Sequence, residues 1–155
     1  MTIDPTNVLA LSDKGLALQQ LGNNREAILY LYKALTIDPH NPFALSNKGV
    51  ALQQLGSYTG AIKYYNKALE IDPNNVFALT KKGNSLNNLG NYTGAIKYLD
   101  KALTIDPANV LALSNRGLSS DYLGNHTTAI TYYDKVLTID PHTKPKKLET
   151  SRIAK

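Results

Sequence analysis

The sequence predicts an all-α protein built from stacked pairs of helices. Glycine and proline recur along the 155 residues at a fixed step of 34, as Gly15, Gly49, Gly83 and Gly117 and as Pro39, Pro73, Pro107 and Pro141. Between these marks, apolar residues recur at spacings of three and four, which favours helices over strands. A period of this length is typical of supersecondary units that each pack on their neighbours.

Residues 42–75 show the unit most clearly, with a first helix predicted over 42–55 and a second over 59–71. Asn41 suits an N-cap, and Pro42 fits the first turn because its missing N–H is not needed there. Gly56 is expected to end the first helix, and the Asp72-Pro73 pair is expected to end the second. Helices of this length are marginal alone in water, so the two must pack together.

The repeated glycine lies in the middle of the first helix, where it costs about 1 kcal/mol relative to alanine. Because this cost recurs in every unit, we expect the glycine to permit a close approach of the two helices. Ala61 and Ala68 of the second helix are expected to form the surface that faces Gly49.

Seven positions of the unit carry the apolar, small and proline residues of a known motif: Leu45, Gly49, Leu52, Ala61, Tyr65, Ala68 and Pro73. The pattern resembles the tetratricopeptide repeat (TPR) family. This resemblance implies a right-handed α-α superhelix, or α-solenoid, with four full repeats at 8–41, 42–75, 76–109 and 110–143. Residues 1–7 are expected to be the remnant of a preceding repeat, and residues 144–155 a basic C-terminal tail or capping helix.

One departure from the family concerns the residue before each glycine. It is basic in all four units, as Lys14, Lys48, Lys82 and Arg116, where many members carry leucine. The aliphatic stems of such side chains can cover apolar surface while the charge stays outside.

Composition limits the possible functions. The chain has no cysteine, which excludes disulfides and thiolate metal sites, and no apolar run long enough to span a bilayer. Residues 144–155 hold +4 of the net charge of +5, so the repeats are almost neutral and no nucleic-acid partner is expected. We expect a cytoplasmic protein.

No catalytic residue, metal site or cofactor site is expected. His40, His126 and His142 lie in turns, and none has a second ligand at metal-binding spacing on a helix face. The serines and aspartates recur at the same places in the repeats, whereas a nucleophile needs one activated copy beside a base. We therefore expect a protein that is not an enzyme.

The resemblance implies that the first helices line a concave groove, which receives an extended peptide or a partner's helix. Eleven residues are predicted to contact the partner: Asp13, Phe43, Asn47, Val50, Gln54, Phe77, Lys81, Asn84, Asn88, Asn115 and Tyr122. Amide side chains can both donate to and accept from a peptide backbone. The polar members fit an ordinary solvated surface as well, and the two phenylalanines fit either a partner anchor or packing between repeats.

One subfamily of these repeats clamps the C-terminal carboxylate of chaperones. Only Asn47 and Lys81 match that clamp here, so we do not expect this ligand. Two other roles stay open: self-assembly of copies through the open ends of the stack, and recruitment of substrates for a larger enzyme of which this array is a part.

Overall fold

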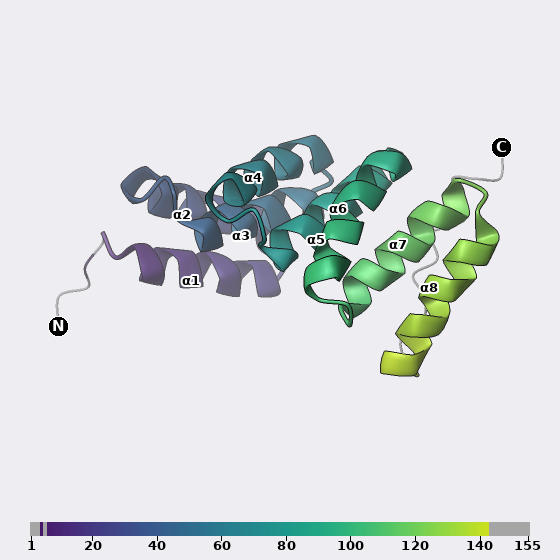
Figure 1. Cartoon of the computed structure of the whole chain (residues 1–155). Helices are drawn as coiled ribbons and strands as arrows, with labels where there is room; N and C mark the ends of the chain where they lie inside the picture. Colours follow the sequence, from purple (N-terminus) through teal and green to yellow (C-terminus); the bar gives the residue numbers. More distant parts are fainter. Residues whose placement is uncertain (1–3, 5, 143–155) are drawn as a thin grey trace.

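The computed structural model describes residue 4 and residues 6–142, and this part of the chain contains eight α-helices and no strand (Figure 1). They are α1 (Val8–Gln20), α2 (Asn24–Ile37), α3 (Pro42–Gln54), α4 (Tyr58–Ile71), α5 (Val76–Asn88), α6 (Tyr92–Ile105), α7 (Val110–Tyr122) and α8 (His126–Ile139). We call α1, α3, α5 and α7 the first helices and the other four the second helices. The predicted all-α fold is confirmed, and the bounds of α3 and α4 differ from the prediction by one residue.

Local sequence signals account for the helix ends. An asparagine caps each first helix, and its side-chain oxygen accepts a hydrogen bond from the backbone N–H three residues later, as Asn41 does from Ala44 at 3.0 Å. The turn inside each pair contains a glycine with φ near +80°, such as Gly56. This left-handed conformation suits glycine because it lacks a Cβ atom.

The helices form two layers. Each first helix packs against its own second helix, and α3, α5 and α7 also pack against the second helix of the pair before them. Consecutive first helices contact one another as well. In the described part of the chain, the second helices contact no other second helix. The first helices therefore form the closely spaced inner layer of the superhelix, and the second helices spread apart on the outside (Figure 1).

The predicted close approach at the repeated glycine is confirmed, but the facing residue is not the predicted alanine. A Cβ atom on Gly49 would lie 2.5 Å from Cε1 of Tyr65, and one on Gly83 would lie 2.5 Å from Cγ of Leu99. Ala61 is fully buried in the same pair. The glycine thus makes room for a large side chain of the second helix.

Two predicted segments are wholly or partly outside the described residues. The expected tail or capping helix at 144–155 lies outside them, and of the expected remnant at 1–7 only Asp4, Thr6 and Asn7 are described. Asn7 is the N-cap of α1.

Candidate functional site

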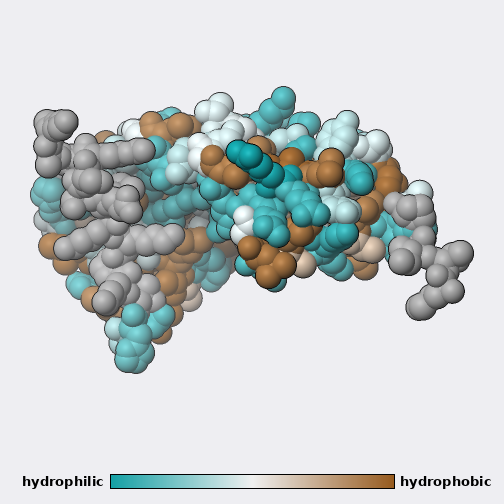
Figure 2. All heavy atoms as spheres, turned by 180° about the vertical axis from the view of Figure 1, so that it is seen from behind, coloured by the Kyte–Doolittle hydropathy of each residue, from teal (hydrophilic) through white to brown (hydrophobic). Residues whose placement is uncertain are grey.

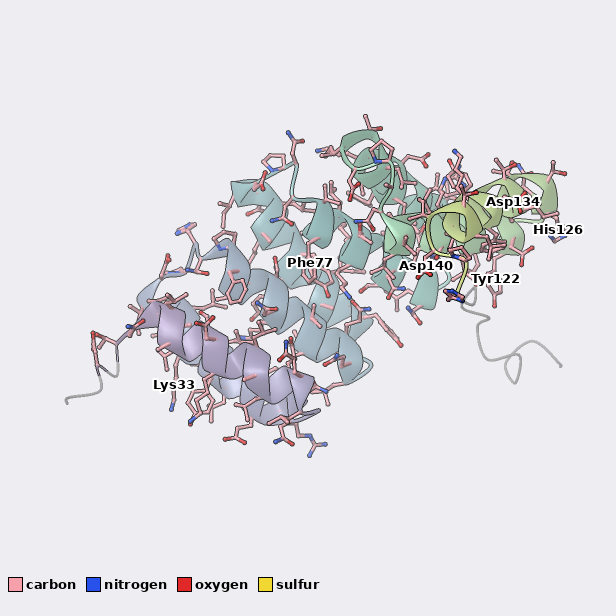
Figure 3. All side chains as sticks on the ribbon, turned by 90° about the horizontal axis from the view of Figure 1, so that it is seen from below. Lys33, Phe77, Tyr122, His126, Asp134 and Asp140 are labelled. Carbon is pink, nitrogen blue, oxygen red and sulfur yellow. The ribbon has the colours of Figure 1, made fainter. Side chains whose placement is uncertain are left out.

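The face of the first helices carries a row of apolar side chains at the first turn of each helix. Leu9 is 67% exposed, Phe43 42% and Phe77 45%, while Leu111 is half-buried. Figure 3 shows Phe77 near the middle of the array. Seen from behind, the surface shows hydrophobic side chains in separate groups among hydrophilic ones (Figure 2).

One turn further along, Asn47 and Asn115 are buried between repeats, with exposures of 6% and 3%. Each Nδ2 donates to a carbonyl one turn earlier, Asn47 to Phe43 at 3.0 Å and Asn115 to Leu111 at 2.8 Å. Their backbone carbonyls accept bonds from amides of the preceding first helix. Gln19 donates to the carbonyl of Asn47 at 2.5 Å, and Asn87 to that of Asn115 at 3.0 Å.

Asn84 lies at the centre of a hydrogen-bonded chain that crosses three repeats. The hydroxyl of Tyr65 donates to Gln53 Oε1 at 2.8 Å, and Gln53 Nε2 donates to Asn84 Oδ1 at 2.5 Å. Asn84 Nδ2 then donates to Asn115 Oδ1 at 2.7 Å. We call this chain of four residues the amide network. It links α3, α5 and α7 through side chains.

Four further predicted contact residues come from α1, α3 and α5. Asp13, Gln54 and Asn88 are exposed, and Val50 is half-buried. Asn88 donates to the carbonyl of Asn84 at 2.8 Å.

Lys81 and Tyr122 complete the predicted set from two separate regions. The Nζ atom of Lys81, which is half-buried, lies 5.5 Å from the ring centroid of Phe77. Tyr122 lies at the α7–α8 end, away from Phe77 (Figure 3), and stacks on Tyr92 with ring centroids 4.7 Å apart. Burial raises the pKa of Tyr122 above its ordinary value.

Sequence comparison identifies the repeat. A tetratricopeptide repeat model matches residues 42–75 and 76–109, and a second model of the same repeat matches residues 10–41 and 111–143. This chain belongs to the tetratricopeptide repeat family. A search among curated proteins found no match for the sequence.

Solved structures of other TPR proteins share the fold. A crystal structure of MamA is 25% identical with a TM-score of 0.81, over 89% of this chain and 81% of that one. PilF of Pseudomonas aeruginosa is 30% identical with a TM-score of 0.81, over 88% of this chain and 62% of that one. The first TPR of Spaghetti (RPAP3), bound to the HSP90 peptide SRMEEVD, is 25% identical with a TM-score of 0.74, over 79% of this chain and 97% of that one.

The TPR helices also carry a repeated contact that sequence reasoning missed. Each basic residue before the repeated glycine lies over a tyrosine of the second helix in the same pair. The Nζ atom is 3.6 Å from the ring centroid for Lys82 over Tyr98 and 4.6 Å for Lys48 over Tyr64. The same pairing occurs in the first and fourth repeats. The signal was present in the sequence, because a tyrosine follows each of these basic residues after 16 positions.

The basic residues of the two middle repeats are almost fully buried. Lys48 is 7% exposed and Lys82 is 8% exposed. Each ammonium group lies against an aromatic face, which attracts cations.

Two further searches concern the described residues alone. None of their histidine, aspartate and glutamate side chains gather in groups of three or more that could hold a metal ion. None of the helices in this part of the TPR array has the length and apolar character needed to cross a membrane.

Proposed function

We propose that this TPR array is a protein-interaction module that holds an extended peptide, or the helix of a partner, along the face of its first helices. The exposure of Phe43 and Phe77 carries this proposal. Two large aromatic side chains stand in solvent at the same place in consecutive repeats, where packing between repeats could have buried them. Aromatic residues of this kind are common anchors of binding energy.

The amide network supports the proposal because it prepares the floor of the groove before a partner binds. Asn84 both accepts from Gln53 and donates to Asn115, so the amide orientations are fixed in the free protein. A carbonyl oxygen has two lone pairs and can accept a second bond from a peptide N–H. Groups that are already ordered lose little entropy on binding.

The remaining predicted residues give the proposed groove its polar borders. Lys81 supplies a positive charge beside Phe77, and Asp13 supplies a negative charge in the first repeat. Gln54 and Asn88 are the other polar members, and Val50 and Tyr122 complete the predicted set. The similar RPAP3 structure holds an HSP90 peptide, which supports a peptide ligand as a class.

A selected peptide tests the proposal. A random peptide library displayed on phage would be selected against the parent protein, and the best peptide would be made with a fluorescent label. We expect the double variant Phe43→Ala/Phe77→Ala to weaken its binding by about tenfold or more, since each tenfold step needs only about 1.4 kcal/mol. The matched control is Ile37→Ala/Ile105→Ala, which removes two similarly exposed apolar side chains from second helices.

The comparison distinguishes specific binding in the groove from nonspecific binding to exposed apolar side chains. Fluorescence polarisation should show near-parental affinity for the control and weak binding for the groove variant. Equal affinities of the parent and the groove variant would contradict the proposal.

Self-association is a second candidate function. Ile130 of the last pair is 59% exposed, although its counterparts Ile62 and Ile96 are half-buried, so the α8 end of the described array carries an apolar side chain in solvent. Sedimentation velocity of the parent over a range of concentrations distinguishes this role. A monomer throughout leaves the groove as the site of interaction, whether the array acts alone or recruits substrates for a larger enzyme.

A further inference from the structure

A cavity of about 350 Å³ lies on the outer side of the array, where α4 and α6 both pack on α5 without contacting each other. It is separate from the proposed groove, because second helices form most of its walls. Three lysines line it, Lys82, Lys97 and Lys101, together with Asn66 and Glu70. The cavity therefore combines three positive charges with one negative charge.

Lys82 is the most deeply placed of these charges. Its side chain is more than nine-tenths buried, and its ammonium group lies 3.6 Å from the ring centroid of Tyr98. Within the described residues, no carboxylate lies within ion-pair distance of Lys82, and Glu70 forms no ion pair either. The ammonium group of Lys82 can therefore pair with a carboxylate from outside, and a hydrogen bond between two charged groups is stronger than one between neutral groups.

Two neighbouring contacts involve the lysines that line the cavity. Hydrogen bonding from the Lys82 ammonium group holds the pKa of the Tyr98 hydroxyl below its ordinary value. Lys101 Nζ donates to the backbone carbonyl of Pro73 at 2.6 Å, so it is held at the edge of the same cavity.

We call the contact between a second helix and the first helix of the next repeat a junction. The junction between α6 and α7 shows how a carboxylate pairs with the basic side chain. Arg116 occupies the same repeat position as Lys82, and its Nε lies 2.6 Å from Oδ1 of Asp100 in the preceding second helix. The residue equivalent to Asp100 at the earlier junction is Asn66, 34 positions before it. Asn66 is neutral, and its buried Oδ1 has no hydrogen-bond partner. The earlier junction therefore has the cation of the later one but lacks its carboxylate.

The junction between the first two repeats does not offer the same site. There the ammonium group of Lys48 lies between two tyrosine rings, 4.6 Å from the centroid of Tyr64 and 5.0 Å from that of Tyr32. The cavity beside it is also smaller, at about 180 Å³.

We infer that the cavity between α4 and α6 binds an acidic side chain of a protein partner, whose carboxylate takes beside Lys82 the place that Asp100 takes beside Arg116. This surface lies outside the proposed groove and does not depend on it. An acidic peptide segment fits because it can supply the carboxylate and place further acidic groups near Lys97 and Lys101.

The test uses the full chain labelled with ¹⁵N and a synthetic tetraglutamate peptide with blocked ends. Backbone signals would be followed by NMR during titration with this peptide, with the tetraglutamine peptide and with inorganic phosphate. We expect saturable shifts around Pro73, Lys82 and Tyr98 with tetraglutamate only. Two variants should weaken this binding about tenfold or more: Lys82→Leu, which removes the ammonium group, and Asn66→Asp, which supplies an internal carboxylate.

Two control variants remove the same charge elsewhere. Lys14→Leu changes the equivalent residue of the first repeat, where the described chain has no preceding repeat to form a cavity, and Lys81→Ala changes the adjacent lysine on the groove side of α5. Both should bind tetraglutamate as the parent does, and thermal melting would show that all four variants are folded. Leucine keeps the apolar bulk of the lysine stem beside Leu69 and Leu79, so Lys82→Leu should preserve the packing.

Several results would overturn the inference. Equal shifts in the parent and in folded Lys82→Leu or Asn66→Asp would mean general attraction to surface lysines. Loss of the shifts in Lys81→Ala would place the peptide in the groove, and equal binding of phosphate would show a site for anions in general. The absence of any shift with tetraglutamate would also refute it.

Discussion

Gly83→Ala should destabilise the array, although alanine is the better helix former. A Cβ atom at this position of α5 would lie 2.5 Å from Cγ and 2.7 Å from Cδ2 of Leu99 in α6. Leu99 is fully buried, and Cγ is a branch point rather than a free end of the side chain. The clash can therefore be relieved only by a rotamer change in a packed core or by moving α5 away from α6.

The magnitude follows from two opposed effects. Alanine gains about 1 kcal/mol over glycine in a helix interior. Overpacking of a well-filled core costs about 1 to 3 kcal/mol, and separation of α5 from α6 would loosen the cluster around Leu79 and Ala102 as well. We expect a net loss of about 1 kcal/mol in the free energy of unfolding, measured by urea titration with far-UV circular dichroism.

A double-mutant cycle makes this reasoning refutable. Leu99→Ala alone should cost about 2 to 5 kcal/mol, because it leaves a cavity. In that background the added methyl group of Gly83→Ala has room, so the second substitution should become neutral or stabilising by about 1 kcal/mol. If Gly83→Ala destabilises equally in both backgrounds, or stabilises the parent, contact with Leu99 is not the reason for the glycine.

Two further predictions concern charge and pH. Asp100→Asn should lower the free energy of unfolding by about 1 kcal/mol in low salt, because it removes the ion pair with Arg116. The control Asp134→Asn, at the equivalent place in α8, should have no effect on this free energy. Equal changes in the two variants would contradict the pairing of Asp100 with Arg116. Burial raises the pKa of Tyr65, so the neutral phenol is favoured in the folded state. Its stabilising contribution should be complete below the ordinary tyrosine pKa of about 10 and should decline as pH rises above that value. Spectrophotometric titration should show Tyr65 among the last tyrosines to ionise, and Tyr65→Phe should remove this late component.

The fold could be predicted from the sequence because its main signals are local. Asn41 caps a helix through a bond to the residue three positions later, and Gly56 ends that helix by adopting a positive φ. Such rules act within one turn, and the period of 34 repeats them four times. The partner of the buried glycine was mispredicted because the choice between Ala61 and Tyr65 depends on how the two helices rotate against each other.

The site was harder to predict because its contacts join residues about 30 positions apart. Asn84 was expected to face a partner, and a helical wheel does place it on the inner face. Its bonds to Gln53 and Asn115 arise only because the superhelix brings three first helices together. For this reason a triple substitution of Asn47, Lys81 and Asn84 would disturb stability as well as binding, and substitution of exposed phenylalanines is the cleaner test.

The two proposed surfaces follow from one asymmetry in the packing. Close contacts between first helices let amides bond across repeats, and the exposed Phe43 and Phe77 lie on the same helices. In the part of the chain that the structure describes, the second helices do not contact one another, and a residue of each one faces the basic side chain of the next repeat. That residue decides whether the basic side chain has a carboxylate partner. Asp100 neutralises its junction, whereas Asn66 does not. Because α5 carries Phe77 towards the groove and Lys82 towards the outer cavity, with the buried Leu79 in the core between repeats, both surfaces could be occupied at once.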